Sequence, residues 1–206
     1  MGQAEQQPRR YTVEEYLALE EQSEIRHEFF DGELFAMAGA DVSHNLIGGN
    51  FYMNFRLALR GRPCKVLMEG VQLVVEEGRH YTYPDVMITC NPDDQRARRI
   101  LHAPVLLIEV LSPSTAEYDR GRKFNQYKKL PSLRHYLLVS QTSWLVEWYR
   151  REENDIWSIT SLVEATDALV IPDLNINLTV AEIYEGTDVA PLKIVAEEPT
   201  AAYGPH

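Results

Sequence analysis

The stretch VLLIEVLSPST, residues 105–115, decides the fold of this protein. Its apolar first half predicts a buried strand, and that strand carries one carboxylate, Glu109. The stretch YPDVMI, residues 83–88, predicts a second buried strand that begins beside Asp85. Burying an ionised carboxylate without a partner costs several kcal/mol or more. Two of them indicate a shared cation, which a divalent metal would supply; the ordinary alternative is that each caps a loop or pairs with an arginine.

The other elements can be assigned outward from these two strands. Thr12 and Glu15 form a capping box, which predicts a helix over 12–20. Asp31-Gly32 predicts a tight turn between two strands. The remaining expected elements are a helix over 43–59, strands at 65–68 and 71–75, a helix after Glu109 that opens near Ser114 and ends near Leu130, strands at 135–139, 144–149 and 157–163, and a short helix over 177–184. The pattern is that of one α/β domain, in which the later strands form a meander.

Composition is that of an ordinary globular protein, with 206 residues of which 45% are hydrophobic and 25% charged. We expect a domain over 11–185 with flexible tails at 1–10 and 186–206. No apolar stretch approaches the roughly 18 residues of a membrane span, and the polar N-terminus lacks a secretory signal. Cytoplasmic residence is the default expectation. Cys64 and Cys90 are too few for a thiolate metal site, and we expect both to be buried small apolar residues.

The net charge of −11 argues against a protein that coats nucleic acid, because phosphate binding uses clustered lysines and arginines. Net charge does not decide local fields, however. Basic residues are bunched within 56–62, 96–99 and 120–129. Any one bunch is usually a solvated face, but the third matters more because it lies just after Glu109.

Several motifs together resemble a known family: RHE at 26–28, DGE at 31–33, YPDV at 83–86 and EVLSPST at 109–115, followed by Asp119, Lys123 and Tyr127. Over 11–185 the chain is similar to the Uma-two family of predicted endonucleases. That family lies in the restriction-endonuclease-like superfamily, whose signature is Pro-Asp, a spacer, then an acidic residue, any residue and lysine. The resemblance implies an α/β core with a central mixed sheet flanked by helices, an N-terminal helix and hairpin, and a C-terminal β-meander.

One position departs from the superfamily signature. Two residues after Glu109, where the lysine normally stands, the chain has Leu111. Residues i and i+2 of a strand share a face, so an apolar side chain replaces the ammonium there. Lys123 is the best substitute, because it lies on one stripe of the following helix with Asp119 and Tyr127. The alternative is that Lys123 only pairs with Asp119 on the surface.

The resemblance implies phosphodiester hydrolysis with a divalent metal. Asp85 and Glu109, joined by the carbonyl of Val110, would hold Mg²⁺ or Mn²⁺, since magnesium prefers oxygen ligands and keeps several waters. The metal would polarise the phosphate and lower the pKa of a bound water. Lys123 would orient that water or stabilise charge on the phosphate.

Two further residues are candidates for the site. Glu28 is an outer metal ligand or general base, and the alternative is a carboxylate on the surface of a strand. His44 opens the helix over 43–59, near where nucleases of this type place a helix-borne active-site residue. A histidine at a helix start is more often structural, and that alternative stays open.

Two functions therefore stand. The first is a Mg²⁺-dependent DNA endonuclease, which the two buried carboxylates favour. The second is a catalytically inactive nuclease-fold module that binds nucleic acid or a protein partner, which Leu111 and the acidic net charge favour.

The strand over 144–149 predicts a homodimer. Trp144, Val146 and Trp148 lie on one face and Leu145 and Tyr149 on the other, so both faces are apolar. A second subunit would cover one of them, in the isologous arrangement that is commonest. The alternative is a monomer whose C-terminal segment covers that face.

Overall fold

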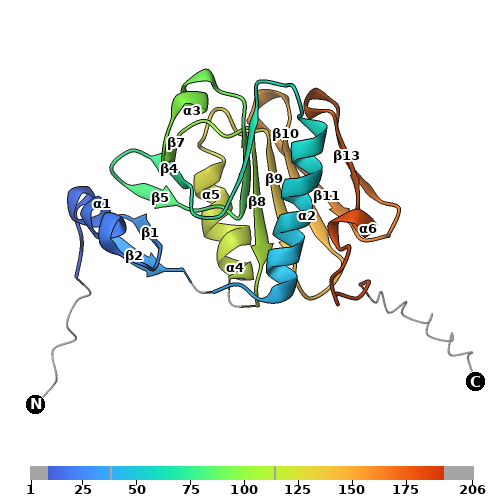
Figure 1. The fold of residues 1–206 in the computed structure, drawn as a ribbon, viewed down its shortest axis with the longest axis horizontal. Helices are drawn as coiled ribbons and strands as arrows, with labels where there is room; N and C mark the ends of the chain where they lie inside the picture. The colour runs from blue at the N-terminus through green and yellow to red at the C-terminus, as the bar shows by residue number, and fades with distance from the viewer. Residues whose placement is uncertain (1–8, 38, 114, 193–206) are drawn as a thin grey trace, which may run out of the picture.

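A central sheet of six strands organises the computed structural model, which describes residues 9–37, 39–113 and 115–192. The six strands form five neighbouring pairs. Only β8 and β9 run parallel and the other four pairs are antiparallel, so the sheet is mixed, as predicted. In spatial order its strands are β11 (Trp157–Leu162), β10 (Val146–Arg151), β9 (His135–Ser140), β8 (Leu106–Leu111), β6 (Val86–Thr89) and β3 (Lys65–Met68). Figure 1 shows this sheet at the centre of the molecule.

The two strands that carry the carboxylates are neighbours. β6 runs antiparallel to β8, with Val86 opposite Ile108. Continuing this register by one residue puts Asp85 opposite Glu109. The sequence predicted both strands, and their pairing explains why two acidic residues that are far apart in the chain come together.

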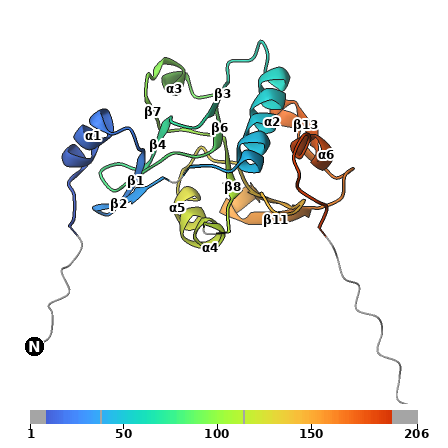
Figure 2. The same ribbon diagram turned by 60° about the horizontal axis from the view of Figure 1, so that its bottom comes forward.

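Helices cover both faces of the central sheet (Figures 1 and 2). On one face α2 (Val42–Ala58) buries Ile47, Phe51 and Phe55 against alternate residues of β6 and β8. On the other face lies a continuous helical segment made of α4 (Ala116–Tyr118), the π-helical turn η1 (Asp119–Lys123) and α5 (Phe124–Tyr127). The predicted helix start at Ser114 lies outside the described residues, and the helix ends at Tyr127, three residues before the prediction.

A second sheet holds the N-terminal elements. Its order is β2 (Glu33–Ala36), β1 (His27–Phe30), β5 (His80–Thr82), β4 (Gln72–Glu76) and β7 (Ile100–Leu101), with α1 (Val13–Gln22) packed on it. The capping box of Thr12 and Glu15 is present. Asp31 and Gly32 both have positive φ, of 49° and 88°, as a two-residue hairpin turn requires. β5 was not predicted, because three residues are too few to show a period.

The C-terminal part differs from the prediction at one element. The segment expected as a helix over 177–184 begins as strand β13 (Ile176–Thr179), which pairs with β12 (Ala168–Ile171) across the turn η3 (Pro172–Leu174). Only α6 (Val180–Ile183) is helical, with Thr179 as its cap. The pairing with β12, which the local sequence does not encode, decides this. The short elements α3 (Pro92–Arg96) and η2 (Glu153–Asp155) complete the fold.

The expectation for the cysteines was wrong. Cys64 and Cys90 form a disulfide, and their Cα atoms are 4.1 Å apart. β3 pairs with β6 so that Lys65 lies opposite Thr89, which puts the two cysteines opposite each other at the next position. The pairing follows from strand register, which a separation of 26 residues does not reveal.

The argument that predicted a dimer also fails. Both faces of β10 are covered by the chain itself, since Val146, Trp148 and Tyr149 are all buried. Trp144 stacks on Tyr184, and its indole nitrogen donates a hydrogen bond to the Val189 carbonyl at 2.8 Å. A C-terminal segment thus covers the face that a second subunit was expected to cover. Among the helices described, none is long and apolar enough to cross a bilayer.

Candidate active site

Asp85 and His44 make the first pair of the site. Asp85 Oδ2 accepts a hydrogen bond of 2.6 Å from the Val110 backbone nitrogen, which binds β6 to β8 at this point. Its other oxygen lies 3.1 Å from His44 Nε2, in the first turn of α2. Burial by itself lowers the pKa of His44, but the contact with Asp85 outweighs it and the pKa is raised. The structure therefore brings His44 and Val110 to Asp85, although Val110 meets it through its amide and not its carbonyl.

Glu109 is buried in the middle of β8, with 4% of its surface exposed. Its Oε1 accepts a hydrogen bond of 2.7 Å from the Tyr127 hydroxyl and lies 3.0 Å from Lys123 Nζ. Burial raises the pKa of Glu109 well above its usual range, and Lys123 opposes this shift. The carboxylate is held at one oxygen by two donors, and its Oε2 accepts no hydrogen bond from the described residues, which leaves it for another ligand.

Lys123 is buried and is the centre of the charge arrangement. Its Nζ lies 3.0 Å from Glu28 Oε1, 3.0 Å from Glu109 Oε1 and 3.7 Å from Asp119 Oδ1. Burial disfavours the charged ammonium, but Glu109, Glu28 and Asp119 outweigh it and raise the pKa of Lys123 well above its usual value. Lys123 is therefore a buried ammonium and not a surface partner of Asp119.

A π-helical turn positions Lys123. The Phe124 amide donates to the Asp119 carbonyl five residues earlier, where an α-helix would bond to the fourth. Such turns hold one extra residue and are frequent at functional sites. The helical stripe of Asp119, Lys123 and Tyr127 predicted the position of Lys123 but not this turn, for which the sequence offers no clear signal.

Glu28 approaches from the second sheet. It lies on β1, its side chain is 13% exposed, and it accepts a hydrogen bond from the Thr82 hydroxyl as well as the contact with Lys123. Burial acts to raise the pKa of Glu28, but Lys123 and Thr82 outweigh it and the pKa lies below its usual value. The side chain is thus an ionised, nearly buried carboxylate that joins the two sheets at Lys123.

The sequence did not single out two neighbours of these groups. Thr82 Oγ1 lies 3.3 Å from the Tyr127 hydroxyl, so it links Glu28 to the Tyr127–Glu109 pair. His80 precedes it on the same face of β5, and its ring is parallel to that of Tyr127. Burial lowers the pKa of His80 to about 4, so the imidazole is neutral at pH 7. Recognising β5 as a strand would have placed both residues on this face.

Leu111 contributes no charged group to the cluster of carboxylates around Lys123. It is buried in an apolar cluster that also contains Leu107 and Tyr127. The position that carries lysine in the superfamily signature is therefore part of the core, and the one ammonium beside Glu109 among the described residues is that of Lys123.

The charges of the site fit a divalent cation. Three carboxylates, from Glu28, Glu109 and Asp119, surround the single ammonium of Lys123. A fourth, that of Asp85, acts on Glu109 and raises its pKa further. This surplus of buried negative charge favours a further cation. Within the part of the chain that the structure describes, no three His, Cys, Asp or Glu side chains are grouped to hold a metal by themselves. Two carboxylates with several waters suffice for Mg²⁺, so the donor set fits that ion. It does not fit a metal ion whose ligands all come from the protein.

A mixed sheet flanked by helices, with paired carboxylates on adjacent strands, defines a restriction-endonuclease-like protein. The model of the Uma2 family, described as "Putative restriction endonuclease", matches residues 13–181, and the chain belongs to this family. Two relatives from Synechocystis are the uncharacterized proteins slr1290 and sll1609. The first is 37% identical and the second 33%; the alignments cover 84% and 74% of this chain and 90% and 87% of the relatives.

A solved structure supports the fold independently. It is a crystal structure of "a putative nuclease belonging to DUF820" from Anabaena variabilis, with a TM-score of 0.70 and 19% sequence identity. The similarity covers 84% of this chain and 97% of that one. At this identity the likeness concerns the fold, and it extends over nearly the whole of the neighbour.

Proposed function

We propose that the protein is a divalent-metal-dependent nuclease that hydrolyses phosphodiester bonds in DNA. The observation that carries this proposal is the Lys123 ammonium held 3.0 Å from both Glu28 and Glu109. A buried lysine at this place supplies the positive charge that the superfamily signature would put at Leu111. The family description, "Putative restriction endonuclease", is the support for DNA as the substrate.

Asp85 and Glu109, with the carbonyl of Val110, are the groups that would hold Mg²⁺ or Mn²⁺. When bound, the ion supplies positive charge that polarises the phosphate and lowers the pKa of a bound water. Each ligand carboxylate is oriented by neighbours: His44 contacts Asp85, and Tyr127 donates to Glu109.

Lys123 and Glu28 would act on the phosphate and on the proton of the attacking water. Lys123 stays protonated, so it can stabilise negative charge that builds on the phosphate during attack. Glu28 is ionised, so it orients Lys123 and can accept a proton from the attacking water. These roles divide the site into a pair of metal-holding carboxylates and a Lys–Glu pair beside them.

The experiment compares cleavage of supercoiled DNA by the wild type, Lys123→Met and Lys128→Met, with Mg²⁺ or Mn²⁺ and with chelator. Lys128 is exposed, directly follows the same helical segment and serves as the matched control. We expect cleavage by the wild type and by Lys128→Met, none by Lys123→Met, and none with chelator. Equal cleavage by wild type and Lys123→Met would remove Lys123 from the mechanism, whereas DNA binding without cleavage by the wild type would favour the inactive binding module.

The homodimer stays a prediction. The apolar face of β10 no longer supports it, because the chain itself covers that face. A dimer would bring two sites to the two strands of one duplex. Light scattering at micromolar concentration distinguishes the cases: a mass of one 23.7 kDa chain would reject the dimer, and twice that mass would support it.

A further inference from the structure

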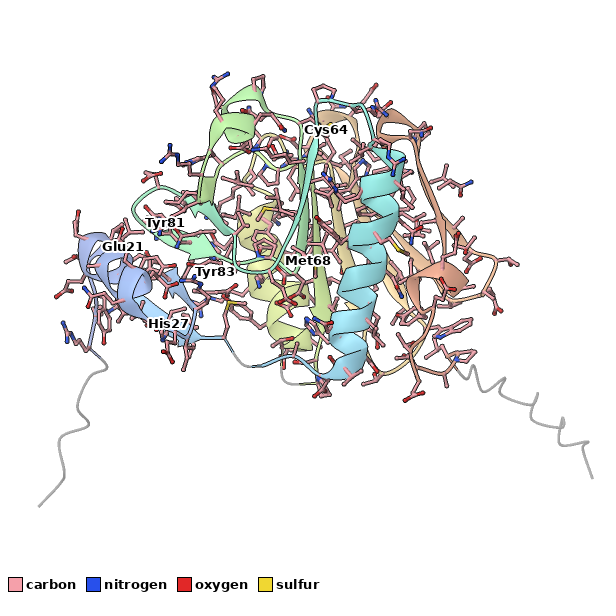
Figure 3. The ribbon with its side chains drawn as sticks, in the orientation of Figure 1. Glu21, His27, Cys64, Met68, Tyr81 and Tyr83 are labelled. Carbon is pink, nitrogen blue, oxygen red and sulfur yellow. A yellow bond between two sulfur atoms is a disulfide. The ribbon has the colours of Figure 1, made fainter. Side chains whose placement is uncertain are left out.

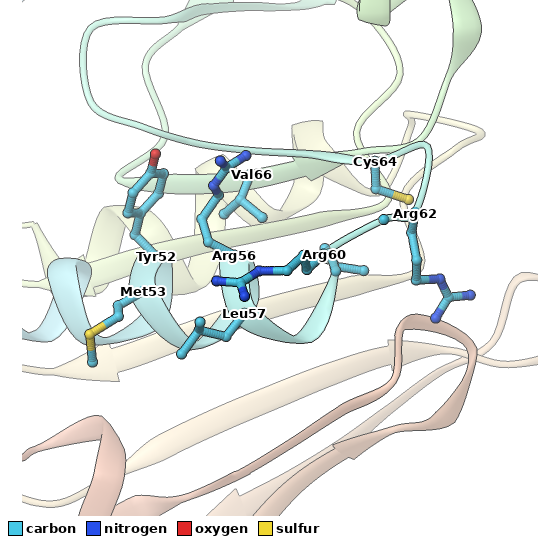
Figure 4. Close-up of a pocket in the computed structure, with 10 residues that line it drawn as sticks. Tyr52, Met53, Arg56, Leu57, Arg60, Arg62, Cys64 and Val66 are labelled. Atoms are coloured by element: carbon cyan, nitrogen blue, oxygen red, sulfur yellow. The ribbon is translucent and has the colours of Figure 1, made fainter.

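A second candidate site lies at the opposite end of α2 from His44. It is a pocket of about 410 Å³ between the last turns of α2 and the start of β3 (Figure 4). Three of the ten residues that line it are arginines and none is acidic. In a chain with 31 acidic and 20 basic side chains, this composition marks a locally positive surface. The pocket is referred to below as the arginine pocket, after Arg56, Arg60 and Arg62.

The end of α2 shapes this pocket. The helix ends at Ala58, and Gly61, with a φ of +79°, turns the chain back toward β3. A residue with a Cβ rarely adopts this conformation, so glycine is needed there. The turn carries Arg60 and Arg62 out on either side, and Arg62 is tied to the Asp173 carbonyl by a hydrogen bond of 2.7 Å.

The other two arginines are available to a ligand. Arg56 and Arg60 are exposed, and neither guanidinium group makes a hydrogen bond or an ion pair with any residue that the structure describes. The carboxyl end of α2 points here and carries about half a negative charge. Two guanidinium groups outweigh it, so the pocket favours an anion. Guanidinium groups bind phosphate oxygens in pairs, with defined geometry.

The pocket is also at a suitable distance from the candidate active site. Cys64, at the pocket, directly precedes β3, and Met68 ends that strand opposite Val86, the residue after Asp85. Figure 3 labels Cys64 and Met68. On the neighbouring antiparallel strand, Cys90 and Asp85 are five residues apart, or about 16 Å of extended chain. A nucleic acid bound at Asp85 extends further than this, so a second phosphate can reach the pocket.

We propose that the arginine pocket binds a backbone phosphate of the nucleic acid whose scissile phosphodiester lies at Lys123. This inference rests on the proposed function, because it takes the same nucleic acid as its ligand. The exposed side chains of Met53 and Leu57 line the pocket beside the arginines and suit contact with a sugar or base. The pocket therefore adds affinity and register at a distance from the reacting phosphate, without touching it.

The test is equilibrium binding of a short fluorescein-labelled DNA duplex, followed by anisotropy in chelator and over a range of salt concentrations. The variant is Arg56→Gln/Arg60→Gln, and the control is Arg98→Gln/Arg134→Gln, which removes two exposed arginines outside the pocket. We expect the pocket variant to bind about tenfold more weakly and with a salt slope lower by about one to two. The control should match the wild type.

Hydrolysis of the small ester bis(p-nitrophenyl) phosphate is measured in parallel, because this substrate cannot span both places. Unchanged hydrolysis by the pocket variant, together with weakened duplex binding, supports the inference. Three outcomes would overturn the inference and leave the proposed function standing. The pocket variant could bind the duplex as well as the wild type does, or the control could lose as much binding as the pocket variant. The third is a wild type that hydrolyses the ester but does not bind the duplex. Pocket-dependent duplex binding by a wild type that hydrolyses neither DNA nor the ester would support the pocket and reject the nuclease.

Discussion

The Tyr127 hydroxyl donates a hydrogen bond of 2.7 Å to Glu109 Oε1, and both side chains are buried. Tyr127 comes from the helical segment after β8, whereas Glu109 is in the middle of β8. The bond therefore ties the segment that carries Lys123 to the strand that carries the carboxylate. It also stabilises the charged form of Glu109, against the burial that raises its pKa.

Tyr127→Phe should weaken metal binding and cleavage by about 10-fold to 100-fold, the usual effect of removing a partner that orients a metal ligand. The ring remains, so packing is conserved and thermal unfolding should change little. Calorimetric titration with Mn²⁺ measures the affinity. Tyr149→Phe is the control, because it removes a hydroxyl from the same aromatic cluster that has no hydrogen bond to the described residues. Equal metal affinity in Tyr127→Phe and Tyr149→Phe would show that the hydroxyl does not orient Glu109.

Asp85→Asn and Glu109→Gln should each abolish binding of Mg²⁺ and Mn²⁺ while the fold stays intact. The described residues hold no third grouped ligand that could replace a lost carboxylate. Asparagine keeps an oxygen that can accept from the Val110 amide, so the β6–β8 contact survives. Calorimetry measures binding and circular dichroism checks the fold, with Glu117→Gln, an exposed carboxylate change on the helical segment, as control. Unchanged affinity in either active-site variant would reject the shared metal site.

Stability should fall as the pH falls from about 6.5 to about 4, in part through His135. The Trp148 indole donates to His135 Nδ1 at 3.2 Å, which requires an unprotonated nitrogen. Burial lowers the pKa of His135 to about 4, so the unfolded chain binds this proton more readily than the native protein does. The stabilisation is complete above the unfolded pKa and is lost toward the folded pKa, by roughly 3 kcal/mol at most.

His135→Gln keeps an acceptor for Trp148 but does not titrate. Urea unfolding of wild type and variant near neutral pH and at about pH 4.5 measures the difference. The variant should lose less stability than the wild type on acidification. An equal loss of unfolding free energy in wild type and variant would mean that His135 does not contribute to the pH dependence.

Loss of the disulfide should lower the free energy of unfolding by about 3 kcal/mol, because Cys64 and Cys90 close a loop of 26 residues. Denaturant unfolding of the wild type and of Cys64→Ser/Cys90→Ser measures it. Thiol titration of the denatured, unreduced wild type should find no free thiol, and Cys90→Ser alone should show one. Two reactive thiols in the wild type would mean that the pair is not oxidised.

The same titration bears on the predicted cytoplasmic location. Structural disulfides are rare in the cytosol of mesophiles, where thiols are kept reduced. Alkylation of thiols in intact cells before lysis would show the state of the pair where the protein resides. Free thiols would agree with the cytoplasm, and an oxidised pair would argue for an oxidising compartment.

Local patterns in the chain predicted most of the elements. Apolar runs identified β6 and β8, and the position of Glu109 on β8 and of Asp85 directly before β6 followed from them. The capping box at Thr12 and the Asp-Gly turn at residue 31 set the N-terminal elements. Helical periodicity put Lys123 on the same stripe as Tyr127. These features depend on residues close together in the chain, whose spacing fixes which side chains share a face.

Tertiary structure alone decided how those pieces meet. Glu28 reaches Lys123 because the second sheet packs against the first, and no local pattern distinguishes it from a surface carboxylate. Strand register joined Cys64 to Cys90 and made residues 177–179 a strand. The chain's own C-terminal segment, which packs on Trp144, removed the need for a second subunit at β10. Each of these depends on contacts between residues far apart in sequence, and such contacts are set by the pairing and packing of whole elements, which the period of a single segment does not specify.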